Sequence, residues 1–125
     1  MFSGNLEIKT IYVPATCAGS TGLVMSGGVA GVDVTKFDGP CVFVLSVSTS
    51  STAGATDKID VTVQTSTSSI HSDAYTDVVS FTRNVTGSTQ FKVVNANELS
   101  KYARIKAVAT GTFVVGLTMI GSTNS

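Results

Sequence analysis

The sequence predicts an all-β protein: an antiparallel β-sandwich of about 7–8 strands, jelly-roll or Greek-key like, with an N-terminal edge strand or arm. Val, Ile and Thr supply 42 of the 125 residues, and β-branched side chains favour a pleated strand over a helix. Glu, Gln and Arg occur twice each, so good helix formers are scarce. Short apolar segments also recur at regular spacing with turn residues between them, as in sandwiches and barrels.

The length predicts a single domain with a substantial core. A chain of 125 residues should fold to about 6,300 Å² of surface, against roughly 18,600 Å² when unfolded. The sequence has no internal repeat and no linker. We therefore expect an N-terminal arm or edge strand over residues 1–14 and one β-sandwich domain over residues 15–125.

The first predicted strand covers residues 6–13, where apolar and polar residues alternate until the phase shifts between Thr10 and Ile11. It ends at Pro14, and proline belongs at the end of a strand or on a sheet edge. This segment is therefore predicted to be an edge strand or an arm. Residues 15–31 are rich in glycine and small side chains, which predicts a long loop with one brief strand.

The central part of the chain contains the clearest strand pattern. Residues 58–66 alternate strictly, with Ile59, Val61 and Val63 on one face, which predicts a half-buried antiparallel strand. Residues 38–40 predict a turn, and residues 96–102 a turn or one short helical turn. The other strands are predicted over residues 32–37, 41–48, 76–82 and 89–95.

The segment 101–121 contains two apolar runs that meet at Thr110-Gly111. Such a tight reversal predicts a hairpin of two adjacent antiparallel strands. The small residues of the first run are expected to lie opposite larger side chains of a facing sheet. Ala103, Ile105, Ala107 and Ala109 are expected to share one face of the first run, and Phe113, Val115, Leu117 and Met119 one face of the second.

Charge and composition argue against several partner classes. Eight basic and eight acidic residues are interspersed without a basic run, so direct nucleic-acid binding is not expected. No membrane segment, secretory signal or small-molecule substrate is predicted. Without a signal, Cys17 and Cys41 are expected to stay reduced, with Cys41 as a core residue; one disulfide between them is the alternative.

Catalytic and metal-binding patterns are not recognisable. His71 is the single histidine and lies in a polar stretch that predicts an exposed loop. With sixteen serines in the chain, a Ser-His-Asp match arises by chance, and no nucleophile turn accompanies it. The aspartates near residues 57–60 and 73–77 are expected to be solvated turn residues. We therefore expect no enzyme activity, no cofactor and no metal.

The order of four segments resembles small virion structural proteins of tailed bacteriophages, namely capsid decoration (cement) or head-associated proteins. The similarity covers roughly residues 30–121 and includes Asp38-Gly39, the strand Val61 to Ser66, Tyr75 to Val78, and Tyr102-Ala103-Arg104 before Gly121. The segments that carry it are VDVTKFDGPCVFVLSVSTSS, DKIDVTVQTSTSS, YTDVVSFTRNVTGSTQFKVVN and SKYARIKAVATGTFVVGLTMIG.

The resemblance implies a capsid decoration protein that stabilises the head from outside by bridging capsomers. It implies the major capsid protein as partner, self-association as a homotrimer, and a location on the capsid surface of the virion after assembly in the bacterial cytoplasm. Alternatives are a tail tube, head–tail connector or fibre component, or a carbohydrate-binding adhesive module. The predicted interface residues are Leu6, Ile8, Ile11, Tyr12, Val13, Leu23, Val24 and Met25.

Overall fold

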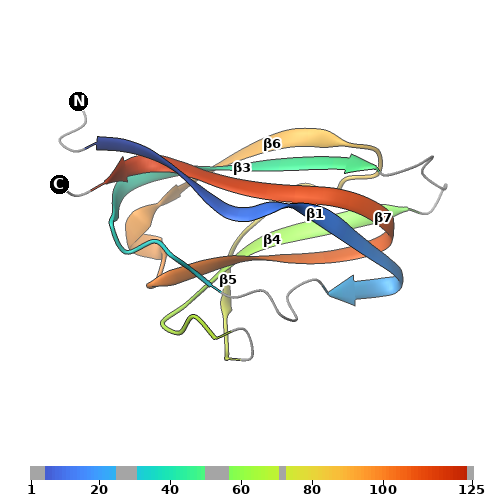
Figure 1. Ribbon diagram of the computed structural model, residues 1–125, viewed down its shortest axis with the longest axis horizontal. Coiled ribbons are helices and arrows are strands. Elements are labelled where there is room, and N and C mark those ends of the chain that lie inside the picture. Colours follow the sequence, from blue (N-terminus) through green and yellow to red (C-terminus); the bar gives the residue numbers. More distant parts are fainter. Residues whose placement is uncertain (1–4, 25–30, 50–56, 71–72, 124–125) are drawn as a thin grey trace.

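A computed structural model describes residues 5–24, 31–49, 57–70 and 73–123, and in the first segment it describes the side chains from Leu6 to Cys17 (Figure 1). These residues form antiparallel strands and one turn of 3-10 helix, so the predicted all-β sandwich is confirmed. No helix in the described residues is long and apolar enough to cross a membrane. The elements are β1 (Asn5–Val24), β2 (Val32–Asp33), β3 (Phe37–Thr49), β4 (Lys58–Ser66), β5 (Thr76–Ser80), β6 (Ser88–Asn95), η1 (Ala96–Glu98) and β7 (Tyr102–Thr123).

Strand β7 is the centre of the sandwich, because it pairs with β1, β2, β3 and β4. Its second half, from Phe113 onward, lies between the first part of β1 and β3, and β6 continues that layer beyond β3. Its first half, up to Thr110, lies between β4 and the pair formed by β2 and the end of β1. Strand β5 completes the second layer beyond β4. One half of β7 therefore lies inside each layer and joins the strands on its two sides.

The predicted hairpin at Thr110-Gly111 is wrong in its pairing. The chain does reverse there, as the two red and orange halves of β7 show in Figure 1, but each half pairs with other strands. Gly111 has a φ of +92°, a conformation that glycine adopts without a steric penalty. Strand β1 follows the same path, with Gly19 opposite Gly111. The two strands therefore turn one end of the sandwich together and join its layers.

Strand β1 is an edge strand, as predicted, but it is much longer than expected. It continues through Pro14 to Val24 and pairs with β7 along this length, so the predicted loop over residues 15–31 is wrong for residues 15–24. The predicted division after residue 14 falls inside the strand. The predicted phase shift is confirmed, since the register with β7 shifts between Thr10 and Tyr12. Such a bulge moves the side chains that follow it to the other face.

The core lies between the two layers and follows the predicted alternation. The inward residues of β4 and of both halves of β7 are buried, and the folded surface of 6520 Å² agrees with the size expected for the chain. The small alanines of the first half of β7 share this core with the larger residues of its second half. The largest fully buried side chains are Phe43, Phe113, Leu45, Ile59, Ile105, Leu117 and Met119.

Local sequence signals near β3 and β6 are only partly matched. The turn predicted over residues 38–40 is a bulge inside β3, where Gly39 has a φ of +72°. The predicted helical turn is confirmed as η1, which the Asn95 side chain caps by accepting a hydrogen bond from the Asn97 N–H.

Cys17 and Cys41 are buried free thiols, and burial raises the pKa of both.

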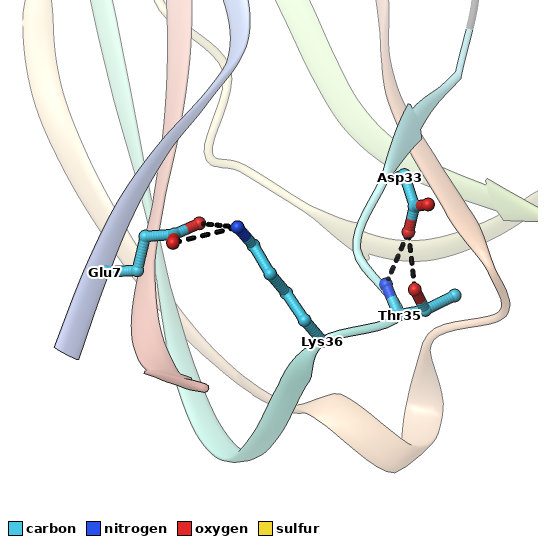
Figure 2. A network of polar contacts seen from close by, with 4 residues as sticks. All are labelled: Glu7, Asp33, Thr35 and Lys36. Carbon is cyan, nitrogen blue, oxygen red and sulfur yellow. Dashed lines mark hydrogen bonds and ion pairs between the residues drawn. The ribbon is translucent and has the colours of Figure 1, made fainter. Parts of the chain in front are cut away.

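Polar contacts tie the first part of β1 to the loop between β2 and β3 (Figure 2). The Lys36 ammonium lies 2.8 and 2.6 Å from the two carboxylate oxygens of Glu7. The Asp33 carboxylate accepts hydrogen bonds from the Thr35 N–H and hydroxyl, at 2.9 and 2.6 Å. Both pairs are exposed, and an exposed ion pair adds about 0–1 kcal/mol. They order the loop that leads into β3.

Thr35 makes the stability of this loop dependent on pH. Its hydroxyl and backbone hydrogen bonds, with a smaller effect of Lys9 and Lys36, lower the pKa of Asp33 below its ordinary 3.8. A lowered folded-state pKa adds stability above the unfolded-state pKa, and this is lost as pH falls through the folded-state pKa. We expect Asp33→Asn to flatten the acid limb of urea unfolding below about pH 4. Thr35→Ala should flatten it less, and an unchanged acid limb in both variants would contradict the assignment.

Candidate interaction face

The outward side of the layer formed by β1, the second half of β7, β3 and β6 carries a row of apolar side chains that crosses the layer, with further apolar residues on either side of it. In antiparallel strands, directly opposite residues point to the same face. Because Met119 and Phe43 point into the core, their neighbours Ile120 and Val42 point outward. We call this surface the outer apolar face and define it as Leu6, Ile8, Val42, Val44, Phe91, Val93, Val114 and Ile120.

Strand register aligns these side chains in rows that cross the layer. One row joins Ile8, Ile120, Val42 and Val93, each directly opposite the next. The following row joins Thr10, Thr118, Val44 and Phe91 in the same way. The face therefore extends from one edge of the layer to the other.

Much of this apolar area is open to solvent. Leu6, Ile8, Phe91 and Val93 are 62%, 68%, 64% and 70% exposed. With the half-buried members, the face presents roughly 600 Å² of apolar surface, estimated from typical side-chain areas. The largest apolar patch of a soluble monomer is typically ~300–600 Å² and is often functional, so this face lies at the upper end of that range.

The two outer faces of the sandwich differ in charge. The two rows described above contain no charged side chain, and Asp38 lies one row beyond, opposite Ser122. On the other layer, outward positions of β4 and β7 include Asp60 and Lys106. This difference suits an arrangement in which a partner covers the uncharged apolar face and the charged face stays in water.

Arg104 and its neighbours form a buried polar cluster on the outward side of the second layer. Arg104 is 7% exposed and stacks on the Tyr75 ring at 3.7 Å from its centroid. Its Nε donates to Gln64 Oε1 at 3.0 Å, and Gln64 Nε2 donates to Asp77 Oδ1 at 2.9 Å. The Tyr75 hydroxyl donates to the Ser68 carbonyl at 2.6 Å. These contacts explain why Arg104 and Gln64, at outward positions, are buried.

The predicted interface residues fall into different environments. Leu6 and Ile8 belong to the outer apolar face, and Val13 is 69% exposed beside Pro14. Ile11 is 4% exposed and packs in the core, because the bulge turns it inward. Tyr12 is half-buried against the core. The backbones of Leu23 and Val24 pair with Ala109 and Val108, and Met25 lies outside the described residues.

Sequence reasoning missed the part of the face on β3 and β6. Val42 and Val44 were included in a strand but assigned no role, and Phe91 and Val93 lie on the predicted strand 89–95. The run from Cys41 to Val47 is apolar at almost every position, a pattern typical of a strand covered on both faces. That run was the available signal for a second apolar surface.

Metal-ligand clusters and pockets are the other features of the described residues that bear on function. No three His, Cys, Asp or Glu side chains within the described ranges lie close enough together to hold a metal ion, and His71 lies outside those ranges. An open depression of about 320 Å³ contains one charged side chain, that of Lys101. It is lined by Val34, Thr35, Phe37, Thr67, Ala96, Leu99, Ser100 and Lys101.

No protein-family model and no curated protein matches this sequence. Among solved structures, the fold is similar to PBSX exported protein XepA, with a TM-score of 0.57 and 10% identity over 95% of this chain and 38% of that one. It is also similar to chains in structures of infectious bursal disease virus. The Gt strain gives a TM-score of 0.56 and 11% identity over 97% of this chain and 33% of that one. The Gx strain gives 0.51 and 8% over 93% and 32%.

These similarities concern the fold, because the identities are so low. The chain spans about a third of the length of the proteins that it matches. The shared architecture therefore occurs as one part of a larger exported protein and of larger viral chains.

Proposed function

We propose that this protein is a structural component of a virion, and more specifically a decoration protein that binds the outer surface of a tailed-phage head. The observation that carries the proposal is the outer apolar face, on which apolar side chains of β1 and β6 are open to solvent. Such a chain is built to pack against other subunits. The fold that it shares with a PBSX exported protein and with chains of a virus supports the same class of role.

The physical effect would be mechanical. A decoration protein adds contacts across the boundaries between capsomers, and those contacts oppose the outward pressure of packaged DNA. A single stable interface buries about 800 Å² per partner, and many such interfaces act together on one particle. The major capsid protein is the shell partner in this proposal.

The test is the occupancy and effect of the protein on phage heads. We expect purified virions to contain it at a copy number that matches the number of capsomers, and heads that lack it to release DNA at a lower temperature. Adding the purified protein back should restore the wild-type release temperature. Absence from purified particles, or a copy number typical of a single vertex, would overturn the decoration role, and the second result would indicate a connector or fibre.

The structure changes the design of a truncation experiment. Residues 5–14 belong to β1, pair with β7 and include the core residue Ile11. Deleting residues 1–14 would therefore damage the fold as well as any contact. Point substitutions of exposed residues such as Leu6 separate these two effects.

A further inference from the structure

We infer that the outer apolar face binds the same face of a second copy of this chain, so that two sandwiches pack through the layers that contain β3 and β6. This inference deepens the proposed function and rests on it: the outer apolar face would be the contact between two copies, and contact with the shell would fall to the other surfaces of the pair.

The exposed area matches one side of a protein interface. The face presents roughly 600 Å² of apolar surface, and the Thr and Ser side chains around it can extend the contact toward the ~800 Å² per partner of a standard interface. Durable homodimer interfaces are also more apolar than transient ones. Two flat sheets can pack face to face at about 10 Å, as in the interior of a sandwich.

The charge pattern favours an identical partner. Across a two-fold axis the same patch lies on both subunits, so a charge near the axis would meet its own copy. The two rows that contain Ile8 and Thr10 have no charge from one edge of the layer to the other. Asp38 lies beyond these rows, toward the end of the face. The centre of the face can therefore oppose itself without like-charge repulsion.

The two edge strands of this layer, β1 and β6, disfavour pairing with a strand of another chain. Lys9 on β1 and Lys92 on β6 lie at opposite ends of the row that contains Met119 and Phe43, and so point to the core side of the layer. Inward-pointing charged residues on edge strands oppose pairing with another chain. Association through these edges is disfavoured, whereas the face between them is open.

The geometry of the face also distinguishes a pair from the homotrimer that the resemblance implies. A three-fold assembly brings two different patches of each subunit into contact, whereas a two-fold axis uses one patch twice. The described surface has one such apolar face, spread evenly across four strands. A single self-matching patch fits a two-fold pair.

The test is the mass of the free protein in solution, measured by light scattering over a series of about 1 to 100 µM. We expect twice the chain mass of 12.8 kDa, and a fall to the single-chain mass in the double variant Phe91→Ser/Val93→Ser. The matched control is Ile70→Ser/Val85→Ser, which changes two side chains of 56% and 55% exposure outside this layer. This control should keep the double mass.

A second measurement shows whether each variant is folded and tests the pair independently. Each variant is checked by circular dichroism, and its unfolding temperature is followed against protein concentration. A pair that dissociates on unfolding has an unfolding temperature that rises with concentration, and we expect that rise in the wild type and in the control, but not in the face variant. A folded face variant that keeps the double mass would overturn the inference, as would a wild type of one-chain or three-chain mass.

The outcomes also separate this inference from the proposed function, because the mass is measured without particles. A wild-type monomer that still occupies phage heads would overturn the pairing and leave the decoration role intact. A wild-type pair that is absent from virions would do the reverse.

Discussion

Phe43→Ala is expected to lower the free energy of unfolding by about 3–5 kcal/mol, the cost of truncating a buried phenylalanine. Phe43 is fully buried at the centre of β3, between Met119 of β7 and Lys92 of β6 in register. Its removal loses apolar burial and leaves a cavity that rigid neighbouring strands cannot close. Since small domains have total stabilities of about 5–15 kcal/mol, this one change would remove a large part of the margin.

Chemical denaturation at fixed protein concentration measures this effect. The conservative variant Phe43→Leu keeps most of the volume and should cost less than about 1.5 kcal/mol if the sheet repacks. Val85→Ala, at a position that is 55% exposed, should stay within about 0.5 kcal/mol of the wild type. A loss for Phe43→Ala no larger than that for Val85→Ala would show that the core is not where the structure places it.

Gly111→Ala is expected to destabilise the protein more than Gly39→Ala does, although both glycines have a positive φ. A Cβ at Gly39 meets no atom within 4 Å, whereas one at Gly111 would lie 2.6 and 2.7 Å from the carboxylate oxygens of Asp57. Both changes impose backbone strain of about 1–3 kcal/mol. At Gly111 the Asp57 side chain must move as well, so we expect a total loss of roughly 2–4 kcal/mol.

The two glycine variants control for each other, because they differ mainly in the space around the new methyl group. A double-mutant cycle with Asp57→Ala measures the steric part, since residues in contact are not additive. We expect the loss caused by Gly111→Ala to shrink in the Asp57→Ala background. Equal losses at the two glycines would mean that Asp57 does not limit the space at this turn.

The elements best predicted from the sequence are those in which one strand buries one face. Residues 58–66 were predicted as a half-buried strand, and β4 has these bounds, with Ile59, Val61 and Val63 in the core. Gln64 departs from that pattern because Arg104 and Asp77, which arrive from other strands, hold it with hydrogen bonds. The alternation pattern is a property of one strand, and it carries no information about the side chains that neighbouring strands bring into contact with it.

Pairing partners explain the two largest errors. Residues 15–24 are small and glycine-rich, so composition predicts a loop, but backbone pairing with β7 holds them as a strand. The Thr110-Gly111 reversal has the same local signal whether its two arms pair with each other or with other strands. That choice depends on β1, β3 and β4, which lie far away in the sequence. Local pattern could not decide it.

The candidate face could be predicted only in part. Leu6 and Ile8 were identified because an edge strand that ends at a proline suggested an exposed arm, and both are exposed. Phe91 and Val93 lie on the other edge strand of the same layer, and their position beside Val44 and Val42 depends on register. The sequence alone does not distinguish an apolar residue that points outward from one that points inward. Its exposure is known only once the strands of the layer are placed side by side.

The position of β7 also constrains how the polypeptide acquires its shape. The partners Asn5 and Thr123 are separated by almost the whole sequence, and contacts between distant residues slow folding. While a ribosome makes this chain, β1 to β4 emerge before the strand that must lie between them. Until then their apolar sides have no cover, and such intermediates are prone to aggregate. Efficient production should therefore depend on chaperone capacity and on slow synthesis at low temperature.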